Sequence, residues 1–511
     1  MSVATQEFSR FRAYLWPIHR WELKKFIPLL VIYTLICFNY NILRAAKDAL
    51  VVTASGAEAL PFIKVWAILP MAVLLTFLFT KLSNRFHIEK VFYIMISSFI
   101  CFFFLFAFVL YPYQDFIHPH RLADSLQKYL PQGFQGLIAL FRNWSFTLFY
   151  VMSELWGTMI MTVLFWGFAN EITSVNDAKR FYAILGLGAN VSGIFSGLTS
   201  MGLSKGVLSV LGLASAHNSW EHGLKLIIGT VVFFGLVVIF LFRWYNKTIL
   251  QGFFSKSSHE LDSYSRPKIK MSLRKNFSYL AKSKYLICIA IIVLTYNISM
   301  NLIEIIWKDQ INLLYPNPTD YNIYMAKVLT CMGILSTLMA FFVYGSLMRK
   351  QTWTFSALVT PIIVSFTGFF FFSFILFKNA GFASFTSLIG MSPLALSVFF
   401  GGAQNCLSRA CKYTVFDITK EMAFIPLSAE CKLKGKAAID GIGSRLGKSG
   451  GSVFHQGLLI VFGSVAASTP YVAALLLIVV LTWIAATTSL GQQFNTLTSP
   501  TPSETPLPSE V

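Results

Sequence analysis

The stretch VFYIMISSFICFFFLFAFVLY, residues 91–111, decides the fold class of this chain. It contains no Asp, Glu, Lys or Arg. About 20 consecutive apolar residues are enough for a helix to cross the hydrocarbon core of a bilayer. Because backbone polar groups in lipid have no water to pair with, a run of this length is expected to be helical. The stretch therefore predicts a transmembrane helix.

Apolar runs of comparable length recur along the whole chain. About twelve are long enough to span a membrane, with predicted limits at 26–43, 61–80, 90–111, 137–169, 181–203, 223–243, 285–306, 326–347, 353–377, 385–408, 440–463 and 469–488. The composition agrees, since 55% of the 511 residues are hydrophobic and 12% are charged, against about 25% charged in soluble domains. We predict an all-α polytopic membrane protein.

The basic excess follows the loops. The net charge is +19, and Lys and Arg gather in alternate loops, most densely after residue 243 and after residue 408. The positive-inside rule explains most of this charge without a nucleic-acid partner. It also predicts that both termini are cytoplasmic. Residues 1–25 lack the apolar core of a signal peptide, so we expect a multi-pass protein of a bacterial inner membrane.

The predicted spans fall into two groups of six. We expect a cytoplasmic N-terminal segment, a first six-helix half, a basic cytoplasmic linker, a second six-helix half and a disordered tail, at residues 1–25, 26–243, 244–284, 285–488 and 489–511. This is the plan of major-facilitator transporters, in which the substrate site lies near the middle of the membrane between the halves.

Several charged residues lie within the predicted spans, where each costs about 2.5–3.5 kcal/mol on insertion scales and usually has a role. Lys64 stands in PFIKVWAILP, where the alternative is a lysine that reaches the interface. Glu154 stands deep in YVMSELWGTMIM, where the alternative is a structural ion pair. Glu304 shares a helical face with Asn301, but Lys308 at i+4 offers an ordinary helix pair instead. These residues are candidates for a polar cavity.

Two further groups of cations are candidates for anion binding. Arg44 and Lys47 lie with Asp48 at the end of the first span, where a solvated helix end is the alternative. Lys436 and Lys448 lie in the glycine-rich stretch 434–452, whose backbone amides can approach an anion. The stretch contains GKS but lacks the glycine that a phosphate-binding P-loop requires. We find no catalytic or metal-binding motif, and expect neither an enzyme nor a cofactor.

Seven strings together resemble the nucleotide transporter family of chlamydiae, rickettsiae and plant plastids, the ATP/ADP translocases. They are FNYNILRAAKDALVVT (38–53), PFIKVWAILP (61–70), SELWGTMIMTVLFWGFANEIT (153–173), AKRFYAILGLGANVSG (178–193), NLIEIIWK (301–308), KYTVFDITKEMAFIPL (412–427) and KGKAAID…GKSGGS (434–452). The resemblance implies a transporter of about twelve helices that imports host nucleotide, most often ATP in exchange for ADP plus phosphate.

The family's critical charges fall on Lys64, Glu154, Glu304 and Lys448. With Arg44, Lys47, Lys436 and Asn301 they form the predicted substrate site, in a protein expected to work as a monomer in the lipid bilayer. Many ATP/ADP exchangers of the family read LRDTKD where this chain has Ala45 and Ala46. Proton-coupled uptake of ribonucleotides, or exchange of another nucleotide such as GTP, UTP or NAD, is therefore the alternative.

Overall fold

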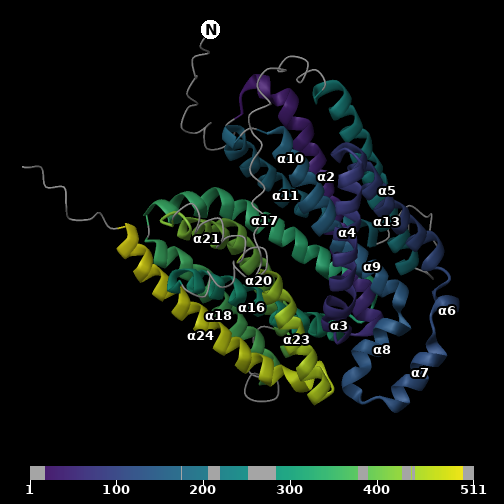
Figure 1. Cartoon of the computed structure of the whole chain (residues 1–511). Coiled ribbons are helices and arrows are strands. Elements are labelled where there is room, and N and C mark those ends of the chain that lie inside the picture. The colour runs from purple at the N-terminus through teal and green to yellow at the C-terminus, as the bar shows by residue number, and fades with distance from the viewer. Residues whose placement is uncertain are drawn as a thin grey trace, which may run out of the picture. The chain divides into compact units, whose positions relative to one another are not determined.

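The computed structural model describes residues 18–173, 175–204, 219–250, 283–350, 352–377, 390–427, 439 and 444–498 (Figure 1). The chain divides into two compact units. The first unit comprises residues 1–267, 305–338 and 456–467, and the second comprises 268–304, 339–455 and 468–511. The described residues of each unit are mostly helical and include no strand, which confirms the predicted all-α class.

Ten helical stretches of the described residues are long and apolar enough to cross a membrane. Two further helices, α20 (Pro393–Cys411) and α23 (Ser444–Phe462), each have 19 residues and coincide with the other two predicted spans. These two are more polar, because α20 carries Gln, Asn and Arg and α23 carries Lys, Gln and His. The quoted stretch forms α5 (Ile88–Leu105), continued by the π-helical turn η3 (Phe106–Leu110).

Helix α2 (Leu23–Ser55) is the central helix of the first unit (Figure 1). It packs against α9 (Trp144–Leu155), α11 (Val175–Ser204) and α13 (Ser219–Trp244). Polar side chains make specific bonds in these contacts: Asn39 donates to the Val231 carbonyl at 3.0 Å, and Asn41 donates to the Ser192 hydroxyl at 3.2 Å. Interhelical hydrogen bonds of this kind stabilise helix packing in lipid, where the hydrophobic effect does not drive helices together.

The remaining described elements of the first unit follow the chain order. They are η1 (Arg20–Glu22), α3 (Ala59–Phe62), η2 (Ile63–Ile68), α4 (Leu69–Arg85), α6 (Gln114–Ile117), α7 (His120–Tyr129), η4 (Gln132–Phe134), α8 (Gln135–Arg142), η5 (Trp156–Phe165), α10 (Trp166–Ile172) and η7 (Tyr245–Leu250), with parts of α16 (Lys284–Leu314) and α17 (Pro318–Lys350). Of these, η2, η5 and η7 are π-helical. Such segments are rare in proteins, and those that occur are often found at functional sites.

The second unit contains α18 (Trp353–Leu376), α20, η9 (Lys412–Phe416), α21 (Asp417–Ala423) and α24 (Val465–Thr498). Helix α18 packs along α20, and its Trp353 indole donates to the Thr419 carbonyl at 3.0 Å. Tyr296, Phe416 and Trp483 form an aromatic cluster. This cluster joins three helices of the unit that are far apart in sequence.

Two predicted boundaries are wrong. The fourth span does not begin at 137, because the backbone at Asn143 leaves helical geometry and separates α8 from α9. The last helix runs to Thr498, so residues 489–498 are helical and not part of a disordered tail. Apolar content defines a span well, but a helix continues past it wherever polar residues still pair along the backbone.

The segment between α5 and α9 contains a histidine whose titration should affect stability. The imidazole of His118 contacts the Ser145 hydroxyl at 2.7 Å and lies edge-on to Phe146. Burial, reinforced by nearby His120, lowers the pKa of His118 below its ordinary 6.5, whereas Asp115 acts in the opposite direction. The neutral ring is therefore the form that the fold favours.

We expect thermal stability to be highest above about pH 6.5 and to fall as the pH decreases toward the lowered pKa of His118. The unfolded state binds the extra proton in that range, so protonation favours unfolding. Melting temperatures of the detergent-solubilised protein between pH 7.5 and 5.5 would measure this. The H118N variant should lose part of the pH dependence, and an unchanged dependence would contradict the assignment.

Candidate functional site

Four charged side chains of the first unit form a cluster on α2, α9 and α16. The Lys47 ammonium lies 3.1 Å from Asp48 Oδ1 and 3.3 Å from Glu154 Oε2. The Lys308 ammonium lies 2.9 Å from the same Asp48 oxygen. Lys47 also lies over the ring of Tyr150, 3.7 Å from its centroid. The cluster thus joins residues that are up to 260 positions apart in sequence.

Burial differs sharply among the four groups. The side chains of Lys47, Asp48 and Lys308 are 3%, 1% and 1% exposed, whereas that of Glu154 is 38% exposed. The formal charges of the two ammonium groups and the two carboxylates sum to zero. Pairing of this kind makes buried charges tolerable. Among the four side chains, Glu154 is the most exposed.

The local sequence explains how these groups are presented. Glu154 lies in the last turn of α9, which ends at Leu155 before the π-helical segment η5, and Tyr150 lies one helical turn earlier on the same face. Lys47 and Asp48 are adjacent on α2, so each points to a different neighbour around the helix. The alternative of a solvated helix end at residues 44–48 is wrong, because α2 continues to Ser55 and buries both side chains.

The other predicted cations of the first unit lie close in sequence to this cluster. Arg44 is half-buried on α2, one turn before Lys47 and Asp48. Lys64 is half-buried within the π-helical turn η2, which begins at Ile63.

The second unit contains the remaining predicted residues. The Asn301 amide donates to the Ser452 hydroxyl on α23 at 2.9 Å. Glycines permit this approach: a Cβ on Gly447 would lie 2.8 Å from Asn297, and one on Gly451 would lie 3.1 Å from Asn301. Glu304 is half-buried one turn after Asn301 on α16. Gly447 and Gly451 therefore permit α23 to pack closely against α16.

Lys448 lies within α23, next to Gly447, but its side chain is outside the described part of the structure. Lys436 lies outside the described residues altogether. Their predicted contact with substrate stays a prediction.

Sequence reasoning missed Asp48, Lys308 and Tyr150 as site residues. Lys308 had been considered only as an alternative local i,i+4 partner of Glu304, which is the pairing that helical spacing suggests. The structure records ion pairs of Asp48 with Lys47 and with Lys308. The available signal was the burial cost of these charges, since each follows shortly after a predicted apolar span.

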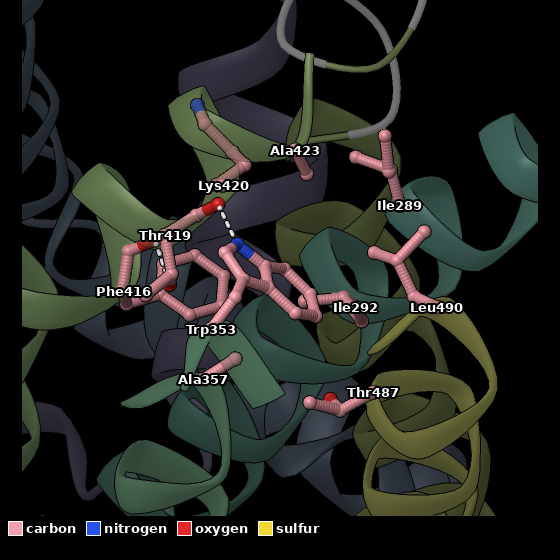
Figure 2. Close-up of a pocket in the computed structure, with 10 residues that line it drawn as sticks. All are labelled: Ile289, Ile292, Trp353, Ala357, Phe416, Thr419, Lys420, Ala423, Thr487 and Leu490. Carbon is pink, nitrogen blue, oxygen red and sulfur yellow. Dashed lines mark hydrogen bonds between the residues drawn. The ribbon is translucent and has the colours of Figure 1, made fainter. Parts of the chain in front are cut away.

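A small pocket in the second unit is a poor substrate site. Figure 2 shows the indole of Trp353 at its centre, surrounded by apolar side chains that include Ile292 and Leu490. Its one charged lining residue, Lys420, points away from the indole and pairs with Glu421 at 3.5 Å. A polyanion needs several converging cations, which this pocket does not supply.

Among the described residues, no group of His, Cys, Asp and Glu could hold a metal ion. The side chains of the cluster offer ionic pairing and hydrogen bonding. A phosphate can replace a carboxylate as the partner of a lysine, because both present oxygens to the ammonium.

Comparisons with known proteins agree with the resemblance described from the sequence. The family model described as "TLC ATP/ADP transporter" matches residues 1–494. The chain is 43% identical to ADP,ATP carrier protein 1 of Chlamydia pneumoniae over 490 residues, covering 95% of this chain and 94% of that protein. It is 44% identical to the chloroplastic ADP,ATP carrier protein 1 of Arabidopsis thaliana over 480 residues, covering 93% and 75%.

Solved structures also resemble the fold. A bacterial homologue of the iron transporter ferroportin, in an inward-facing state, aligns with a TM-score of 0.50 and 13% identity, covering 94% of this chain and all of that one. At this identity the likeness concerns the fold alone. It supports the predicted polytopic, major-facilitator-like class.

Proposed function

The chain belongs to the TLC ATP/ADP transporter family, as its sequence predicts, and from this premise we propose that it exchanges ATP for ADP across a membrane, with phosphate accompanying ADP. The family is one of membrane carriers, not enzymes. The observation that carries the proposal from the structure is the buried charge cluster, in which Lys47 is shared between Asp48 and the half-exposed Glu154.

In this proposal the phosphates of the nucleotide bind Lys47 by displacing Glu154. Arg44 and Lys64 lie nearby in sequence and add positive charge, and Lys436 and Lys448 do so from the second half of the chain. Glu304 and Asn301 complete the site. Lysine binds phosphate as a point charge, and arginine adds bidentate hydrogen bonds.

Exchange follows from the same ion pairs. When the site is empty, Glu154 neutralises Lys47 and the carrier is held in one state. A bound nucleotide takes over that pairing, so the loaded carrier can reorient, because a ligand shifts a conformational equilibrium only by its differential affinity for the two states. Import then requires a nucleotide to leave for each one that enters.

We further propose a location and organisation. The protein lies in a bacterial inner membrane with both termini in the cytoplasm, since the most basic loops would then face inward. Its residues 26–243 and 285–488 act as two six-helix halves joined by the linker 244–284. One chain contains every residue of the proposed site, so a monomer suffices for transport.

Counterflow in proteoliposomes tests the proposal. Uptake of [α-32P]ATP should be fast when the vesicles contain ADP and close to background when they contain no nucleotide. Unlabelled ADP should compete strongly, and GTP, UTP and NAD weakly.

Two results would contradict exchange of ATP for ADP. Uptake that needs no internal nucleotide and is abolished by a protonophore indicates proton symport. Stronger competition by GTP, UTP or NAD than by ADP indicates another nucleotide. Vesicles containing the K225M variant provide the control, because Lys225 pairs with Glu221 at 2.7 Å on one helix, away from the cluster in sequence and half-exposed.

A further inference from the structure

The ion pair between Asp48 and Lys308 ties α2 to α16 within the first unit. Lys308 belongs to residues 305–338, which the sequence assigns to the second six-helix half but which are part of the first unit. Neither side chain is more than 1% exposed. The pair can therefore separate only if water or another polar group reaches both charges, because an unpaired buried charge is strongly unfavourable.

Contacts between α11 and α17, in the same unit, include small and polar groups. The Asn322 amide donates to the hydroxyls of Ser200 and Ser204, at 3.1 and 2.8 Å. A Cβ on Gly333 would lie 2.9 Å from the carbonyl oxygen of Asn190. Small residues let helix backbones approach closely. Water can replace these hydrogen bonds when the helices separate, which distinguishes this contact from an apolar core.

A third contact involves residues 456–467, which the sequence also assigns to the second half. The Gln456 amide donates to the Pro61 carbonyl at 2.8 Å. A Cβ on Gly133 would lie 2.6 Å from the carbonyl oxygen of Ile460. These contacts involve residues near the ends of their helices, namely Pro61, Lys308, Asn322 and Ile460. In the predicted topology, the loops next to these helix ends lie on the side of the membrane opposite the cytoplasmic termini.

We propose that Asp48 and Lys308 form an ion-pair gate that closes this end of the carrier, with Asp48 as a positioning residue that also holds Lys47 beside Glu154. This rests on the proposed function, since a gate has meaning only for a carrier that opens to two sides. Breaking the pair leaves a charge buried in the closed state but hydrated in the open state. The equilibrium therefore moves toward the open state.

The test measures opening without reference to any substrate. In a background whose cysteines are replaced by serine, the S200C substitution puts a thiol at a position that is fully buried against Asn322. A membrane-impermeant thiol reagent, added to the side away from the termini, should label it slowly. The D48N substitution should accelerate labelling at least tenfold. K308Q breaks the same pair and should do likewise, so the test survives if one variant fails to fold.

Two further variants make the result specific. The double variant D48K/K308D keeps the total charge of the cluster at zero and should return labelling toward the parent rate. R142Q removes the exposed pair with Asp124 at 2.6 Å and should leave labelling unchanged.

Equal labelling of the D48N, K308Q and parent proteins would overturn the gate. Acceleration by R142Q as large as that by D48N would also overturn it. Because labelling requires no nucleotide, a carrier that fails to exchange ATP for ADP can still pass or fail this test, and the two proposals are judged separately.

Discussion

The K47M substitution is expected to lower ATP/ADP exchange about 30-fold or more, because truncating one partner of a buried charge contact costs roughly 2–5 kcal/mol and each 1.4 kcal/mol is about tenfold. Lys47 is 3% exposed and contacts Asp48, Glu154 and the ring of Tyr150. Methionine keeps the length and apolar stem of the side chain but removes the charge that binds phosphate.

The fold should survive this change. Asp48 keeps Lys308 as a partner at 2.9 Å, and the half-exposed Glu154 can be hydrated. We therefore expect K47M to be produced in amounts close to the parent and to lose initial exchange rate in proteoliposomes. The K225M variant, which removes a partly exposed lysine from a helix pair, should exchange normally. Exchange by K47M at the parent rate would exclude Lys47 from the substrate site.

The G197A substitution is expected to destabilise the protein by about 1–3 kcal/mol, the usual effect of forcing an extra methyl group into a packed contact. Gly197 lies on α11, where a Cβ would overlap the Thr330 hydroxyl and lie 2.6 Å from the carbonyl oxygen of Ala326. Backbone atoms cannot move aside as a flexible side chain can, so the two helices must separate.

Gly186 on the same helix provides a matched control, because a Cβ there would meet nothing within 4 Å. The G186A variant should be neutral or slightly stabilising, since alanine favours helix over glycine by about 1 kcal/mol. Melting temperatures of the two variants in detergent, compared with the parent, measure the difference. A G197A protein that melts with or above G186A would contradict the close approach of α11 and α17.

The sequence was sufficient to predict the helices, but not to predict where all of them begin and end. Hydropathy identified the spans because membrane insertion depends on the local apolar content of about 20 residues. It placed the start of the fourth span too early, because the break at Asn143 is a matter of backbone geometry within a run that is apolar on both sides. It ended the last helix at 488, because the polar residues up to Thr498 carry no hydropathy signal.

The candidate site was predicted only in part. Glu154 was identified because a charge within an apolar span usually has a role, and Lys47 was identified as one of the cations at the end of the first span. The structure brings these two residues together. The pair of Asp48 with Lys308 was not predicted, because helical periodicity indicates only neighbours three or four residues away. A partner 260 residues distant leaves no trace in the spacing of a single sequence.

The sequence by itself determined that this chain is a polytopic helical carrier, because apolar length and family motifs are properties of short stretches that need no folding to be recognised. Only the tertiary structure decided which charges neutralise one another. The energy of a buried charge depends on the groups within a few ångströms of it, and for Asp48 those groups come from adjacent Lys47 and from Lys308 on a distant helix.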